Sequence, residues 1–141
     1  MDKKDLVQFL NDLFIPLYFR KKGNNWVFDN TELIKVINLQ KSNFSNSYYI
    51  NYGFIIKGLQ LTTTTHVANR LHGNNITNLL NLESEIANSE RFSELEKIIS
   101  DKVIKYAESI NTTQDLKEHL KNRPHLNDIP IVVCQYFDLK M

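Results

Sequence analysis

The run from Leu33 to Lys57 constrains the fold of this chain more than any other segment. Two β-rich stretches, Leu33–Ser42 and Ser47–Lys57, are separated by a short polar loop, and residues of opposite character alternate along the second stretch. Alternation with a period of two is typical of a strand that buries one of its faces. The segment therefore predicts an antiparallel hairpin with one packed face and one open face.

The two stretches also agree on a register. If the loop is centred between Phe44 and Ser45, paired residues have numbers that sum to about 89. Apolar side chains then meet on one face and carboxamides on the other, which neither stretch alone guarantees. The predicted pairs are Ile37 with Tyr52, Leu39 with Ile50, Asn38 with Asn51, and Gln40 with Tyr49.

The segments before the hairpin predict a helix and a short strand. Apolar residues recur at helical spacing from Leu6 to Leu17, and Asp2 is placed to cap the helix. A turn through residues 21–24 and a short strand, Trp26–Asp29, are expected to follow. This N-terminal helix is expected to cover the apolar face of the hairpin.

The pattern weakens between Leu59 and Asn81, and two interpretations remain open. The threonines Thr62–Thr65 favour a fourth strand that ends in a turn at residues 72–75. Alternatively, a short helix begins at His66 and runs to Leu71.

The C-terminal half is expected to be helical. Ser89 is a good N-cap for an apolar stripe from Phe92 to Ile110, and Thr112 with Asp115 has the spacing of a capping box. The last run, Ile129–Phe137, is ambiguous between strand and helix, and its apolar spacing after Pro130 favours a helix.

Together these patterns predict an α+β fold, in which an N-terminal helix packs on a three- to four-stranded antiparallel meander with two to three C-terminal helices. The length of 141 residues suits a single domain spanning residues 1–141. A net charge of +1 argues against nucleic acid and membrane surfaces as partners. The single cysteine, Cys134, excludes an internal disulfide, and no signal peptide is recognised at the N-terminus, so we expect a cytoplasmic protein.

The open face of the hairpin is the first candidate site. Its predicted side chains are mainly uncharged and polar, and amides offer donors and acceptors to a neutral polar ligand or to a partner's backbone. The alternative is a solvated sheet face or an amide network that fixes strand register. The face comprises Asn38, Gln40, Ser42, Tyr49 and Asn51. Gly53 marks a bulge, a close approach of another backbone, or room for a neighbouring aromatic side chain.

His66 and Arg70 are the second candidate, because residues four apart share a helix face if this stretch is helical. Glu83 or Glu85 would have to complete an acid–base set, and no recognised catalytic spacing is present. A structural histidine and an arginine in an ion pair are the alternative. The scattered histidines do not predict a metal site, and no cofactor is expected.

Four short motifs occur in one order along the first half of the chain. They are Pro16-x-x-Phe19-Arg-Lys-Lys-Gly23 followed by Trp26, then Gln40-Lys41-Ser42, then Asn51-Tyr-Gly53, and finally His66-Val-x-x-Arg70-Leu71. In these motifs the chain resembles a small bacterial family known as domain of unknown function 4304. The resemblance implies a cytosolic α+β domain and brings no activity. Two departures are a tyrosine, Tyr18, where the family has a glycine, and the lack of tryptophan in residues 79–84.

The sequence thus favours a non-enzymatic bacterial binding or protein-interaction domain that uses its polar sheet face, with an unidentified protein or small polar ligand as the partner. The alternative is a small-molecule-binding protein or enzyme with a site around His66 and Arg70.

Overall fold

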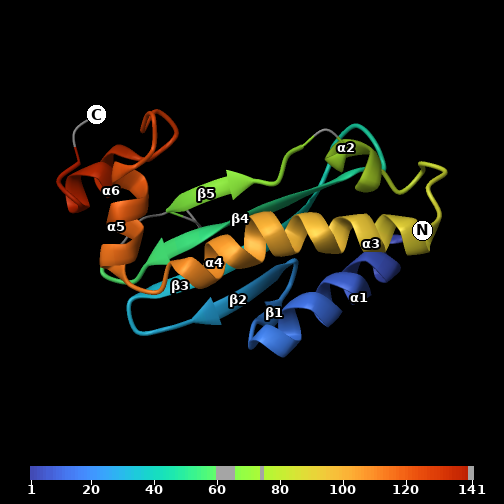
Figure 1. The fold of residues 1–141 in the computed structure, drawn as a ribbon, viewed down its shortest axis with the longest axis horizontal. Coiled ribbons are helices and arrows are strands. Elements are labelled where there is room, and N and C mark those ends of the chain that lie inside the picture. Colours follow the sequence, from blue (N-terminus) through green and yellow to red (C-terminus); the bar gives the residue numbers. More distant parts are fainter. Residues whose placement is uncertain (60–65, 74, 140–141) are drawn as a thin grey trace.

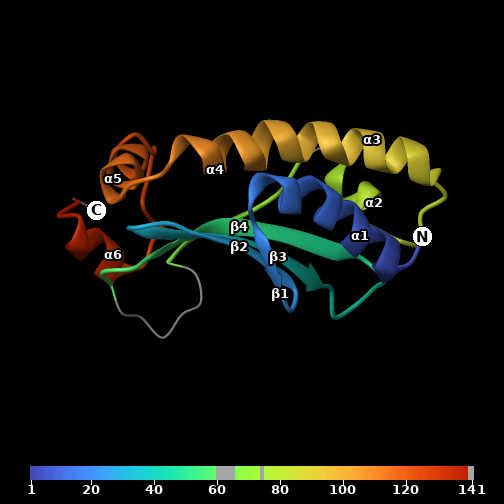
Figure 2. The same ribbon diagram turned by 90° about the horizontal axis from the view of Figure 1, so that it is seen from below.

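The computed structural model describes residues 1–59, 66–73 and 75–139, and it has the predicted α+β architecture. A five-stranded antiparallel sheet carries α1, α3 and α4 on one face, while α5 and α6 lie at one end (Figures 1 and 2). The strands follow chain order: β1 (Arg20–Lys22), β2 (Asn25–Asp29), β3 (Leu33–Lys41), β4 (Tyr48–Ile56) and β5 (Val67–Arg70). The helices are α1 (Lys3–Phe14), α2 (Ile76–Leu79), α3 (Asn88–Ile99), α4 (Lys105–Ser109), α5 (Thr113–Lys121) and α6 (Ile131–Tyr136).

The central hairpin of β3 and β4 has the predicted register. Every predicted pair is observed, and the pairing runs without a bulge from Leu33 opposite Ile56 to Lys41 opposite Tyr48. The register is specified because a shift by one residue would turn all the buried side chains of a strand toward solvent. Asn38 and Asn51 consequently lie side by side on one face.

The sheet has more strands than the three or four predicted. Residues Arg20–Lys22, which the sequence placed partly in a turn, form the edge strand β1, and the turn itself is reduced to Gly23 and Asn24. Gly23 has a left-handed backbone (φ 62°), as this tight connection requires. Three adjacent cations suit an edge strand because their charge discourages pairing with another chain.

The stretch after the hairpin forms a strand, β5, so the helical interpretation from His66 to Leu71 is wrong. Strand β5 pairs antiparallel with β4 and places Ala68 opposite Gly53. A Cβ atom on Gly53 would lie 1.8 Å from the carbonyl oxygen of Val67, which confirms that another backbone closely approaches this glycine. The strand predicted at Thr62–Thr65 lies outside the described residues.

Helix α1 forms as predicted. The Asp2 side chain caps it by accepting a hydrogen bond from the backbone N–H of Asp5. The Asp5 carboxylate accepts one from the backbone N–H of Asp2, which completes a capping box. A short 3₁₀ turn, Ile15–Leu17, follows and ends at Tyr18, whose φ of 71° lies in the left-handed region. That region favours glycine. A glycine, which the family resemblance leads us to expect at this position, would adopt this backbone without strain.

The C-terminal helices differ from prediction at one boundary. Helix α3 begins at Asn88 with Ala87 as its N-cap, so the prediction of Ser89 as the cap is wrong. One π-helical turn, Ser100–Ile104, joins α3 to α4. The capping box of Thr112 and Asp115 at the start of α5 is confirmed, and the ambiguous last run forms helix α6.

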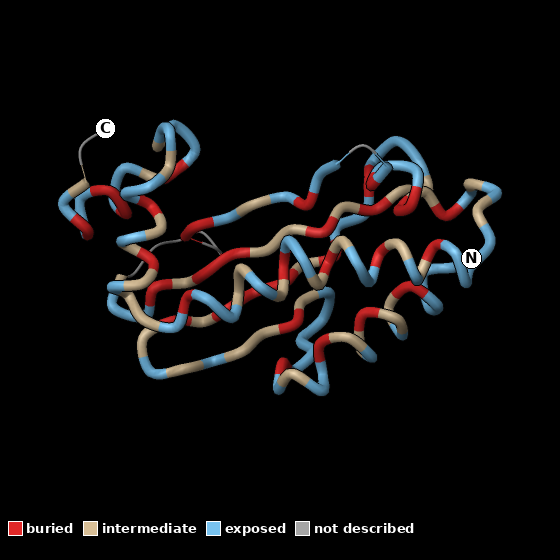
Figure 3. Tube along the Cα trace, viewed as in Figure 1, coloured by how far each residue is buried: buried red, intermediate tan, exposed pale blue. Residues whose placement is uncertain are grey.

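Buried residues occur along the strands and at intervals along the helices (Figure 3). One cluster gathers beneath α1 and α3, around Trp26, Ile37 and Ile50. A second cluster fills the end of the sheet beside α5 and α6 and contains the free thiol of Cys134. Among the described residues, no helix has both the length and the apolar character needed to cross a membrane.

Candidate binding surface on the open sheet face

The face of the sheet opposite α1, α3 and α4 carries the candidate site (Figure 2). Along β3, Ile37 and Leu39 are buried toward the helices, whereas Asn38 and Gln40 alternate with them and point the other way. An open hollow of about 680 Å³ lies over this face. We refer to six polar residues on this side of the sheet as the polar sheet face: Asn25, Asn38, Gln40, Tyr49, Asn51 and Arg70.

A chain of amide hydrogen bonds crosses three strands of this surface. The Nδ2 of Asn38 donates to the Oδ1 of Asn25 on β2 (2.8 Å). The Nδ2 of Asn51 on β4 donates to the Oδ1 of Asn38 (3.0 Å) and to the Oε1 of Gln40 (2.9 Å). Each amide holds the next in place, so the ladder presents a fixed pattern of polar groups.

Arg70 extends the ladder onto β5. Its Nε donates to the Oδ1 of Asn51 (3.0 Å), and its Nη2 donates to the Oε1 of Gln40 (2.9 Å). The guanidinium lies 4.1 Å from the centre of the Tyr49 ring, in the range of a cation–π contact. These three neighbours hold a flexible side chain in one orientation.

Among the residues that the structure describes, no acid matches the charge of Arg70. Within residues 1–59, 66–73 and 75–139, no carboxylate lies at ion-pair distance from its guanidinium. Two of the five N–H donors of an arginine are used by Asn51 and Gln40. The remaining donors are available to a carboxylate or carbonyl oxygen from outside the domain.

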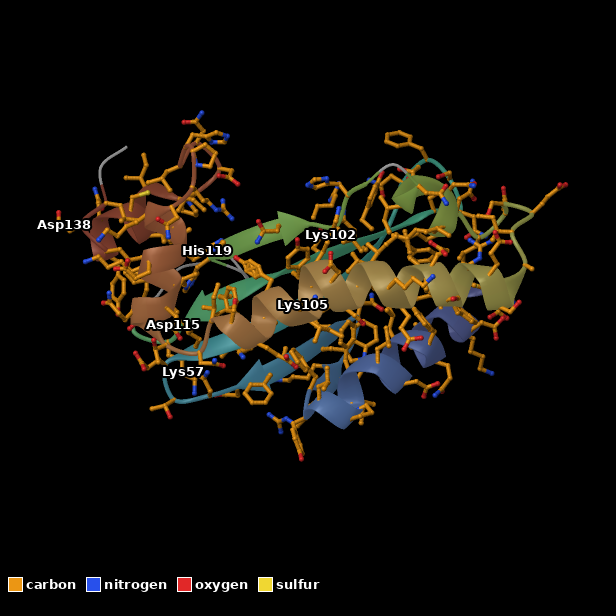
Figure 4. All side chains as sticks on the ribbon, in the orientation of Figure 1. Lys57, Lys102, Lys105, Asp115, His119 and Asp138 are labelled. Atoms are coloured by element: carbon orange, nitrogen blue, oxygen red, sulfur yellow. The ribbon has the colours of Figure 1, made fainter. Side chains whose placement is uncertain are left out.

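The surroundings of the polar sheet face are basic. Lys22 of β1 lines the hollow, and Arg20 has the same parity on this strand. The nearest acid along β2 is Asp29, at the opposite end of the strand, where it pairs with Lys57 (Figure 4). The surface therefore combines neutral amides with cations that form no ion pair within the described part of the chain.

Asn25 was not predicted as part of this site. The short strand was predicted to begin at Trp26, one residue too late, which left Asn25 between the predicted turn and the strand. Extending the antiparallel register across β2 would have placed Asn25 opposite Asn38.

Ser42 does not belong to the surface, contrary to prediction. Its side chain is buried, and its hydroxyl oxygen accepts a hydrogen bond from the backbone N–H of Phe44. The hydroxyl thus shapes the hairpin loop, as serine commonly does in turns.

His66 lies apart from the polar sheet face. Its side chain is 2% exposed, and its Nδ1 accepts a hydrogen bond from the backbone N–H of Ile56 (2.9 Å). Burial lowers the pKa of His66, which favours the neutral ring that this acceptor role requires. Four residues along a strand span about 13 Å, so His66 and Arg70 do not form the pair that a helix would have made.

Glu83 and Glu85 do not complete an acid–base set with Arg70, since neither carboxylate is at ion-pair distance from it in the described structure. The described residues also contain no group of three or more histidine, cysteine or acidic side chains that could hold a metal ion. Of the other histidines, His119 on α5 packs edge-on against the ring of Tyr106 (Figure 4).

Comparison with known proteins identifies one family. The model of a family described as a domain of unknown function, DUF4304, matches residues 10–109. This match includes the whole sheet and α1 from its middle to its end. No curated protein and no solved structure matches the chain.

Proposed function

This chain belongs to the DUF4304 family, whose function is unknown, and we propose that it is a non-enzymatic binding domain that holds a partner on the polar sheet face. The partner is a protein segment or a small polar ligand that offers carboxylate or carbonyl oxygens. The ladder from Asn25 to Arg70 is the observation that supports the proposal.

The geometry suits recognition because its polar groups are already ordered. Free amide side chains lose rotamer entropy when they bind, and this cost is avoided if neighbouring bonds fix them beforehand. Arg70 is held by Gln40, Asn51 and Tyr49, and it keeps donors directed away from them. A planar carboxylate is the group that an arginine binds best.

The alternative of a catalytic or small-molecule site around His66 and Arg70 loses its basis. It needs both side chains and an acid in one concave site. His66, however, is buried, and its Nδ1 accepts a hydrogen bond from the backbone N–H of Ile56. Binding at the polar sheet face needs none of these groups to exchange protons.

The setting we propose is the bacterial cytosol, from the motifs that the chain shares with its family and from its single cysteine. Nucleic acid is not the proposed partner, because the total charge is only +1 and sequence-independent binding to phosphates depends on many cations.

A photo-crosslinking experiment tests the proposal. A benzophenone amino acid is introduced at Val27, which lines the hollow and takes no part in the ladder, or at the exposed Lys105 on the solvent side of α4 as a control (Figure 4). The full chain is irradiated in the cells that express it. We expect one saturable adduct at position 27, competed by unlabelled wild-type protein, and none at position 105.

The variant Asn51→Leu provides a matched comparison in the same assay, since it removes the centre of the ladder and preserves the strand. Competition by this variant should be weaker than competition by the wild type. If no adduct forms at position 27 and Asn51→Leu only raises the free energy of unfolding, the amides serve strand register and the proposal is wrong.

A further inference from the structure

A second, separate cavity lies on the helix-covered side of the sheet. It has a volume of about 250 Å³ and opens between the end of the 3₁₀ turn, strands β2 and β3, and helix α4. Its walls are mainly apolar and include Phe19, Phe28, Ile37 and Ile104. Apolar pockets with a few fixed polar groups are typical of sites for small molecules.

One wall of this cavity carries a buried lysine. Lys35 lies on the inner face of β3 between Leu33 and Ile37, and only 6% of it is exposed. Its Nζ donates to the Oδ1 of Asn111 (2.7 Å) and lies 5.2 Å from the centre of the Phe28 ring. Both neighbours line the cavity, so the ammonium lies at the cavity wall.

The buried ammonium has no direct ion pair in the described structure. Burial lowers the pKa of Lys35, while the more distant carboxylates of Glu108 and Asp115 act in the opposite direction. Asp115, on the first turn of α5 (Figure 4), is itself occupied by the backbone N–H groups of Asn111 and Thr112. Buried charges are normally paired, so this cation is poised to accept an anionic oxygen.

The position of the ammonium is fixed in advance. The Nδ2 of Asn111 donates to the carbonyl of Glu108, and the Nδ2 of Asn30 donates to the carbonyl of Asn111. These bonds leave the Oδ1 of Asn111 facing Lys35. An ammonium has three donors, and Asn111 takes one of them.

The rim of the cavity carries an independent sign of use. Tyr18 lines the cavity, is 82% exposed, and has a left-handed backbone, which is strained for a bulky residue. Strained backbone and exposed aromatic rings concentrate at binding sites. The chain thus has a tyrosine at the entrance of the cavity, although a glycine would adopt this backbone without strain.

We propose that this cavity binds a small apolar carboxylate, with the hydrocarbon part against Phe19, Phe28 and Ile104 and the carboxylate on the Lys35 ammonium. The site lies on the opposite face of the sheet from the polar sheet face and does not depend on the function proposed above. Exposed Glu108 lies at the same cavity and disfavours a second negative charge on the ligand.

The test uses three probes of equal chain length with the full protein: octanoate, octanol and octylammonium. Binding is measured by calorimetry and by amide chemical shifts of residues that line the cavity. We expect saturable binding of octanoate, and binding of octylammonium that is at least about tenfold weaker, which corresponds to loss of one charge-assisted contact.

The variant Lys35→Met keeps the length and apolar stem of the side chain. We expect it to weaken octanoate about tenfold or more and to leave octanol nearly unchanged. Glu108→Gln should tighten octanoate, whereas the control Lys105→Met on the solvent side of α4 should not change it. The amide spectrum of each variant confirms that the fold is kept.

Three results would overturn the inference: no saturable octanoate binding, equal binding of octylammonium, or unchanged octanoate binding by Lys35→Met. None of them bears on the polar sheet face. The crosslink at position 27 should form equally well in Lys35→Met, so failure of one proposal can be told from failure of the other.

Discussion

Replacing Lys35 by methionine should make the protein more stable at neutral pH. The ammonium is 6% exposed and bonds directly to one neutral amide, so folding removes its hydration without supplying an adjacent anion. Replacing buried charged groups by apolar residues of similar volume is neutral or stabilising by about 1–4 kcal/mol. The lost bond to Asn111, whose side chain reaches solvent, offsets about 1 kcal/mol. We expect a net gain of about 1–2 kcal/mol in the free energy of unfolding.

The gain should depend on pH with a definite sign. Burial lowers the pKa of Lys35 below its ordinary value of 10.5, so the unfolded chain holds this proton at pH values where the folded chain has released it. Wild-type stability from this group therefore rises as pH increases from the lowered pKa to about 10.5. Methionine carries no such proton, and its advantage over lysine should shrink across this interval.

Urea unfolding followed by circular dichroism at pH 7 and pH 10 measures both effects. Lys105→Met, on the exposed side of α4, is the matched control and should change the free energy of unfolding by no more than about 0.5 kcal/mol. If Lys35→Met unfolds at lower urea than the wild type at pH 7, the lysine stabilises the fold. In that case burial of this ammonium without an adjacent anion does not lower the free energy of unfolding, contrary to the expectation above.

Three further substitutions test the fold. Gly53→Ala should destabilise the protein by about 2 kcal/mol or more and remove hydrogen-exchange protection from β5, because its Cβ would meet the Val67 carbonyl; an unchanged exchange pattern would contradict this. Arg91→Met should cost about 3 kcal/mol in thermal unfolding, since the buried Arg91 guanidinium donates to the carbonyls of Leu79, Asn81 and Ser84; a shift of the midpoint within error would contradict it. Tyr18→Gly should raise stability by about 0.5–1 kcal/mol in urea by relieving the left-handed backbone, and a loss would show that the ring itself stabilises the turn.

The hairpin could be predicted from sequence because two independent patterns had to agree. The alternation in β4 fixes which of its residues are buried, and β3 offers a matching set only in one register. The placement of Asn38 opposite Asn51 followed directly. The helices α1 and α5 were equally accessible, because Asp2 and Thr112 have local capping partners three residues away.

The short strands could not be predicted because their signals are local and weak. Arg20–Lys22 has no apolar alternation, and it becomes a strand only because β2 offers an edge to pair with. His66 and Arg70, just before and at the end of β5, are four residues apart, and this spacing also suits a helix. What decides for a strand is Gly53 on β4, whose missing side chain admits the neighbouring backbone.

Lys35 and Arg91 were missed for a different reason. Both are charged residues that end up nearly fully buried, which is rare for their types. The partner of Lys35 is Asn111, 76 positions along the chain, and the partners of Arg91 are backbone carbonyls at the end of α2 and in the turn after it. A sequence pattern does not reveal such partners. For Lys35 the available signal was its place in the alternation of β3, between Leu33 and Ile37, which puts a cation on the apolar face of the strand.

The two proposed sites share strand β3 and differ in chemistry because of the pleat. Lys35 points toward the helices and Asn38 toward the open face, so the same strand presents a lone cation to an apolar cavity and an amide to water-exposed neighbours. A ligand at one site could influence the other only by moving β3. That strand is paired at nine positions with β4 and at five with β2, and any shift would expose Ile37 and Leu39. The architecture therefore favours two binding events that do not affect each other.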